Sequence, residues 1–155
     1  MNHADLDPVL ERFLEAVPTG DTAALAGFAN IEKLINQTDD EGWTPLMWAA
    51  ATGQEGSARM LLGRRVDINA QSDKGETALM CAAESNDENM LLLLVHAGAR
   101  ADLQNKAGDT LRSILEDNGR PDLIEKINKH IADVATRAEQ PIKVSRPLVL
   151  KKPGM

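Results

Sequence analysis

The stretch GWTPLMWAAATG, residues 42–53, decides the fold, because it returns as GETALMCAAESN at residues 75–86 and as GDTLRSILEDNG at residues 108–119. The copies begin at Gly42, Gly75 and Gly108, so they follow one another at a constant interval. A fixed period of this length is typical of proteins built from stacked structural repeats, in which each repeat is one small supersecondary unit. The sequence therefore predicts a repeat architecture.

The repeat frame extends beyond these copies. Gly20 precedes Gly53 by the same interval, so a degenerate first unit comes before them. We expect a repeat domain at residues 1–140 with units at about residues 5–37, 38–70, 71–103 and 104–139. A basic, Pro-containing tail follows at residues 141–155. For this tail three interpretations stay open: a disordered end, an arm packed along the body of the protein, or an arm that docks on a partner or adds a strand.

Each unit is predicted to be a helix–turn–helix pair. The Thr44 hydroxyl can cap the first turn of a helix, and Pro45 fits the first helical position because no donor is needed there. Of all residues 43% are hydrophobic but only 3% are aromatic, and this composition favours helices over strands. Pro121 opens a longer segment with helical periodicity, as expected of a capping helix that ends a stack. The predicted fold class is all-α.

The repeated segment resembles the ankyrin repeat family. The matching residues are Gly42-x-Thr44-Pro45-Leu46-x-x-Ala49-Ala50-x-x-Gly53, then Leu61-Leu62 and Val66-Asp67-Ile68-Asn69-Ala70, with a second copy from Gly75. The sequence departs from the family pattern at Ala78, where Pro is usual, and at Met47 and Met80, where His is usual. The resemblance covers roughly residues 5–135 and implies an ankyrin-repeat solenoid of about four units with a longer C-terminal capping helix and a protein-binding role.

Carried over position by position, the resemblance implies that a partner meets the turn tips and the exposed sides of the first helices, on the concave face. The implied partner-binding residues are Asp40, Glu41, Trp43, Met47, Asp73, Lys74, Glu76, Met80, Glu84 and Asp109. We expect Trp43, Met47 and Met80 to form an apolar strip with an acidic border, which suits a basic, partly apolar partner. The alternative for Trp43 is that it packs across its own turn, whereas Trp48 is expected in the core.

The net charge of −7 is distributed unevenly. Residues 1–140 contain 13 basic and 24 acidic residues, a net charge of −11, and the last fifteen residues carry +4. An acidic body argues against nucleic-acid binding, which requires clustered Lys and Arg. It suits a basic protein partner, although acidity also serves solubility by itself.

The sequence contains no pattern typical of catalysis or of a metal site. His3, His96 and His130 lie far apart, and no pair of them has ligand spacing. Cys81 is expected to be a small buried thiol. We therefore expect no enzymatic activity, no cofactor and no metal.

The function hypothesis is a module that binds another protein. Such a module either masks or inhibits an enzyme or toxin, as an immunity protein does, or serves as a scaffold or adaptor with several partners. An enzyme or metal-binding protein with a site in the groove is the further alternative. One cysteine fits a reducing compartment, and neither a signal peptide nor a membrane span is expected. We therefore expect a cytoplasmic protein without a membrane partner, and a monomer is favoured.

Overall fold

The computed structural model describes residues 7–139, and the expected tail at residues 141–155 lies outside this range. In chain order the helices are α1 (Pro8–Ala16), the 3-10 helix η2 (Val17–Thr19), α2 (Thr22–Ala26), α3 (Ile31–Leu34), α4 (Pro45–Ala51), α5 (Glu55–Leu62), α6 (Ala78–Glu84), α7 (Glu88–His96), α8 (Leu111–Asp117) and α9 (Pro121–Glu139). Strand-like pairing within the described residues is limited to one bridge, between Gln104 and Thr110. The all-α prediction is confirmed.

The repeat period is visible in how the helices begin. Thr44, Thr77 and Thr110 stand one repeat period apart from one another and are the N-caps of α4, α6 and α8. Each hydroxyl oxygen accepts a hydrogen bond of 3.2–3.3 Å from a backbone N–H of the first turn. Such a cap satisfies a donor that has no partner within the helix. The predicted helix start at Thr44 and Pro45 is therefore confirmed.

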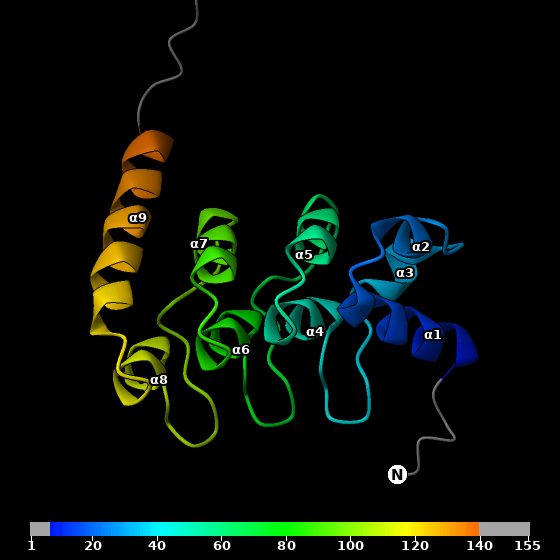
Figure 1. Cartoon of the computed structure of the whole chain (residues 1–155), viewed down its shortest axis with the longest axis horizontal. Coiled ribbons are helices and arrows are strands. Elements are labelled where there is room, and N and C mark those ends of the chain that lie inside the picture. Colours follow the sequence, from blue (N-terminus) through cyan, green and yellow to red (C-terminus); the bar gives the residue numbers. More distant parts are fainter. Residues whose placement is uncertain (1–6, 140–155) are drawn as a thin grey trace, which may run out of the picture.

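The helices stand in two rows (Figure 1). One row contains α1, α4, α6 and α8, and the other contains α2 with α3, α5, α7 and α9. Three loops, at residues 35–44, 63–77 and 97–110, extend from the first row on the side away from the second row. We call these loops the fingers. The long helix α9 stands at one end of the stack, as expected of a capping helix.

Each finger is closed by the same set of hydrogen bonds. In the first finger one carboxylate oxygen of Asp39 accepts from the backbone N–H groups of Glu41 (3.0 Å) and Trp43 (2.9 Å). Ser72 and Asn105, at the equivalent positions, accept in the same way from their own turns. A short polar side chain that bonds its own backbone two residues on stabilises a turn. The three tips therefore share one geometry.

Backbone hydrogen bonds also join each finger to the next. The Asp73 amide donates to the Glu41 carbonyl (3.0 Å), and the Lys106 amide donates to the Lys74 carbonyl (2.9 Å). These contacts bring the chain so close that a Cβ built on Gly42 would lie 2.8 Å from the Asp73 nitrogen. Gly42 also has a φ of 77°, a left-handed conformation that residues with a Cβ rarely adopt. Gly42 is thus required for two reasons.

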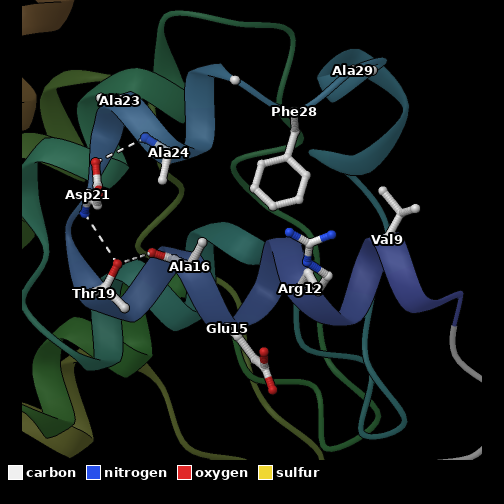
Figure 2. A pocket seen from close by; sticks show the side chains of 11 residues that line it. Val9, Arg12, Glu15, Ala16, Thr19, Asp21, Ala23, Ala24, Phe28 and Ala29 are labelled. Carbon is white, nitrogen blue, oxygen red and sulfur yellow. Dashed lines mark hydrogen bonds between the residues drawn. The ribbon is translucent and has the colours of Figure 1, made fainter.

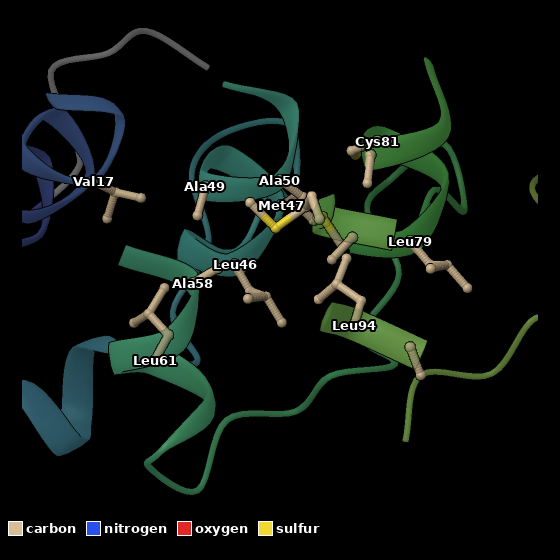
Figure 3. Packing of buried hydrophobic residues seen from close by; sticks show 14 of the residues in the cluster. Val17, Leu46, Met47, Ala49, Ala50, Ala58, Leu61, Leu79, Cys81 and Leu94 are labelled. Atoms are coloured by element: carbon tan, nitrogen blue, oxygen red, sulfur yellow. The ribbon is translucent and has the colours of Figure 1, made fainter. Parts of the chain in front are cut away.

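The core lies between the two rows of helices and is built around small side chains. Ala49 and Ala50 of α4, and Ala82 and Ala83 of α6, are fully buried. Figure 3 shows Ala49 and Ala50 beside larger residues such as Leu46. Because alanine has no bulk beyond its Cβ, neighbouring helices can approach closely at these positions. The pairs of Ala in the repeated stretch therefore set the spacing of the stack.

The first unit is irregular, as its sequence predicts. Asp7 caps α1 with Pro8 at its first position, and Asp21 caps α2. The second helix of this unit is broken at residues 27–30 into α2 and α3, where Asn30 has a φ of 60°. The second helix of the first unit is therefore two short pieces joined by a bend.

Gly75→Ala is expected to destabilise the protein more than Gly108→Ala. Both glycines have left-handed φ values, 79° and 90°, where a Cβ costs about 1–2 kcal/mol. A Cβ on Gly75 would also lie 2.9 Å from the Lys106 nitrogen, whereas nothing lies within 4 Å of the same atom on Gly108. Urea unfolding should give a free energy of unfolding lower by at least about 1 kcal/mol for the first variant than for the second. Equal losses would mean that the approach of the next finger does not constrain residue 75.

Candidate protein-binding face

The predicted binding residues lie on or beside the fingers and on the first-row helices α4 and α6. We call the finger tips, at residues 39–43, 72–76 and 105–109, together with the exposed residues of α4, α6 and α8, the finger-side face. Of the predicted set, five residues are exposed: Asp40, Glu41, Asp73, Lys74 and Glu84. Three more, Trp43, Glu76 and Asp109, are half-buried.

The expectation that Met47 and Met80 contribute to an exposed apolar strip is wrong. Their exposed fractions are 0% and 2%. Both residues occupy the position whose backbone N–H is held by the capping Thr, and this places their side chains inside the stack. In Figure 3 Met47 lies among the buried side chains of α4. A flexible thioether fills the irregular space that small alanines leave, so these two residues serve packing.

Trp43 and Trp48 form an aromatic pair held by one carboxylate. Their ring centroids are 5.1 Å apart, with the planes tilted by 52°. The Trp48 indole N–H donates to the second carboxylate oxygen of Asp39 (2.9 Å), while the first oxygen of Asp39 accepts from the Trp43 backbone. Trp43 therefore packs across its own turn, which was the alternative interpretation. Trp48 was expected in the core, but it is half-buried because its N–H requires a polar partner at the finger.

Asp39 is the residue of this face whose importance the sequence did not reveal. It accepts three hydrogen bonds, two from its own turn and one from the indole of Trp48 in the following helix. The run Asp39-Asp40-Glu41-Gly42 is typical of a turn, and an Asp at the start of a turn commonly stabilises it. The bond to Trp48 could not be read from the sequence, because it depends on how α4 leaves the finger.

Four charged residues of the predicted set gather around the end of α6. The pKa of the Glu84 carboxyl is raised by partial burial and then by the charges of Glu76 and Asp109, while Lys74 acts in the opposite direction. Glu76 comes from the second finger and Asp109 from the third, so the stacking of repeats brings together carboxylates that are distant in sequence. We call Glu76, Glu84 and Asp109 the acidic cluster.

The thiol of Cys81 lies buried beneath this cluster, as expected. Its exposed fraction is 2%. Burial, followed by the charges of Glu76 and Glu84, raises the pKa of the Cys81 thiol from 9.0 to about 12. A thiol is nucleophilic only as the thiolate. In the folded protein Cys81 is therefore an unreactive core residue.

A separate hollow lies between α1 and the α2–α3 segment (Figure 2). Its apolar side contains Val9 and Phe28, and the Phe28 ring packs edge-on against buried Phe13. In the same hollow the Thr19 hydroxyl donates to the Ala16 carbonyl (2.7 Å). The same hydroxyl accepts a hydrogen bond from the Asp21 amide (3.3 Å), so both of its hydrogen bonds are to the local backbone.

Pairs of helices that repeat at a fixed interval, each followed by a finger, define a helical repeat protein. The predicted functional residues are spread over one face of this stack. A family model described as ankyrin repeats (three copies) matches residues 15–107. The chain belongs to the ankyrin repeat family. Repeats of this family generally mediate interaction between proteins. Along the described residues no helix has the length and apolar character needed to cross a membrane.

The similarity to curated relatives covers less than half of the chain. Ankyrin repeat family A protein 2 of mouse is 41% identical over 69 residues, which is 43% of this chain and 22% of the relative. The bovine and human proteins of the same name are each 39% identical over the same lengths. The match thus spans about a fifth of the length of these relatives.

Asp39→Ala is expected to lower the free energy of unfolding by about 2–3 kcal/mol, because three donors lose their acceptor. It should also shift the fluorescence emission to longer wavelength, since the chain has only two tryptophans and both contact this carboxylate. Asn105→Ala is the control, because it removes the same turn bonds from a finger without tryptophan. It should destabilise without moving the emission. An unshifted spectrum for Asp39→Ala would contradict the assigned role of its carboxylate.

Cys81 is expected to resist thiol reagents while the protein is folded. A rise in pKa from 9.0 to about 12 lowers the thiolate fraction at pH 8 by about a thousandfold, in addition to the steric protection of burial. Labelling with a chromogenic disulfide at pH 8 should be complete in denaturant and negligible without it over the same interval. Rapid labelling of the native protein would show that α6 opens locally.

Proposed function

We propose that this protein binds a partner protein through its finger-side face, and that the partner presents a basic or mixed basic and apolar surface. Supporting this proposal above all is the acidic cluster, in which the charges of Glu76 and Asp109 help to raise the free energy of the ionised form of Glu84. A lysine or arginine side chain from a partner would relieve this repulsion. Binding of a basic partner to the finger-side face would therefore be electrostatically favourable.

The position of Glu84 argues that the cluster serves binding. Glu84 is the last residue of α6, where the negative end of the helix dipole disfavours a carboxylate. Partial burial and two neighbouring carboxylates add to this penalty. A residue that breaks several local stability rules together is characteristic of a functional site.

Trp43 supplies the apolar part of the proposed contact surface. It is half-buried, and Asp39 and Trp48 hold its backbone and ring in one arrangement. An aromatic side chain that is already ordered loses little conformational entropy when a partner covers it. Tryptophan is also enriched among the residues that dominate binding energy. Trp43 and the exposed Glu41 of the same finger tip therefore add an apolar and an acidic side chain to the finger-side face.

Within this class we propose that the protein masks or inhibits one partner, such as an enzyme or toxin. The acidic face supports this version, because a strongly charged face attracts one oppositely charged surface and rejects others. The adaptor version is distinguished by stoichiometry. One partner captured in equal amount supports masking, whereas several partners captured in small amounts support an adaptor.

The direct test is affinity capture from the source organism with three baits: the wild type, Glu84→Lys and Glu125→Lys. Glu125 is an exposed residue of α9, away from the fingers, so its variant makes the same charge change elsewhere. The proposal predicts that the wild type and the Glu125 variant retain one partner, and that the Glu84 variant loses it at least tenfold. If both variants retain the partner equally, the binding site does not lie on the finger-side face.

Glu84→Gln is expected to stabilise the protein while it weakens binding. Because folding raises the pKa of Glu84, its ionised form opposes folding, and this penalty grows as pH rises from the ordinary value of 4.5 through the folded-state pKa. The variant should gain roughly 0.3–0.5 kcal/mol at pH 7, since the group is largely solvated, and the gain should vanish below pH 4.5. Thermal unfolding at pH 4 and pH 7 checks the sign. A loss of stability at pH 7 would contradict this electrostatic account.

A further inference from the structure

Two histidines that are distant in sequence meet between the last two second-row helices. His96 ends α7 and His130 lies in the middle of α9. The Nδ1 atom of His96 is 3.3 Å from the Nε2 atom of His130, and the ring centroids are 5.4 Å apart. Their separation in sequence is close to one repeat period, which is why equivalent helices bring the two rings together. Local ligand spacing, the criterion applied to the sequence, could not reveal this pair.

The pair is held by a packed helix interface. Leu94 and Val95 of α7 and Leu123 and Ile127 of α9 are buried. At the other end of the same interface Glu88 accepts hydrogen bonds from Lys126 (2.8 Å) and Arg120 (3.3 Å). His130 lies one helical turn after Ile127, so it continues the face of α9 that packs on α7. The facing nitrogens are therefore positioned by the fold.

The separation of the two facing nitrogens matches the spacing of two ligands on one metal ion. Without an ion, the same 3.3 Å lets one ring donate a long hydrogen bond to the other. Two nitrogen ligands at about 2.0–2.1 Å from a tetrahedral Zn²⁺ ion lie about 3.3–3.4 Å apart. Either ring can present an unprotonated nitrogen to an ion, because neutral imidazole has one acceptor nitrogen in each tautomer.

We propose that His96 and His130 form an open two-histidine site for Zn²⁺, or for a similar late first-row divalent ion, that cross-links α7 to the capping helix α9. Imidazole nitrogen is a preferred ligand of these ions. From residue 7 to residue 139, no three His, Cys, Asp or Glu side chains are close enough together to hold an ion. Water therefore completes the coordination, and the site is weaker than one with three or four protein ligands.

The surroundings leave room for the ion and its water. A hollow beside the pair is bordered by Glu55 and Arg59 of α5 and by Asn89 of α7. Arg59 is paired with Glu55 at 3.5 Å, which offsets its charge toward an incoming cation. His96 is exposed and His130 is half-buried, so an ion can reach the pair from solvent.

The test compares thermal unfolding with and without ZnCl₂ for the wild type, His96→Gln, His130→Gln and the control His3→Gln. At about ten times its dissociation constant an ion that binds only the folded state should raise Tm by roughly 3–6 °C. The wild type and the His3 variant should show this shift, and the other two variants should not. Comparing each variant with itself removes any effect of the substitution on basal stability.

A second readout identifies the ligating atoms. Long-range ¹H–¹⁵N spectra of the imidazole rings should show zinc-induced shifts at Nδ1 of His96 and Nε2 of His130, at one ion per chain by titration calorimetry. No shift of Tm in the wild type up to about 1 mM zinc, as an order-of-magnitude ceiling for a useful site, would overturn the proposal. The proposal would also be overturned if zinc still raised the Tm of His96→Gln, or if only the His3→Gln variant lost the zinc-induced shift of Tm.

Discussion

The structure depends on the close contact between successive fingers. The Asp73 and Lys106 amides each donate to a carbonyl of the preceding finger, and this is possible only where the chain has no side chain in the way. Gly42 and Gly75 meet that requirement and also adopt the left-handed conformation of the turn. Once the fingers are joined in this manner, the spacing of the first-row helices is fixed, and buried alanines are required between them.

The same contact creates the candidate binding face. Because each finger lies against the next, charged residues that are separated by about one repeat come together in space, as Glu76, Glu84 and Asp109 do. The turn bonds of Asp39 likewise order Trp43 before any partner arrives. Elements that build the fold and residues that offer a surface therefore alternate along the repeated stretch. Thr44, Leu46 and Ala50 face inward, whereas Glu41, Lys74 and Glu84 are exposed.

The repeat frame and the helix caps could be predicted from the sequence, because Gly, Thr-Pro and the Ala pairs act through local geometry. The direction of individual side chains was less accessible. Met47 and Met80 were expected on the surface, since the resemblance assigns that position to contacts, but a thioether is apolar and flexible enough to fill the gap beside small alanines. Trp48 was expected in the core, yet its indole N–H requires an acceptor and finds Asp39. The His96–His130 pair depends on the angle at which α9 crosses α7, which no local pattern encodes.

The claim that the protein binds through its finger-side face is tested most directly by hydrogen exchange with mass spectrometry. The exchange rates of the protein alone are compared with those of its complex with the captured partner. The account predicts added protection at the finger tips, residues 39–43, 72–76 and 105–109, and at the end of α6 around Glu84. Helices α5 and α7 of the second row should exchange at unchanged rates. Added protection confined to the second row, with the fingers unaffected, would contradict the claim that this protein acts through its finger-side face.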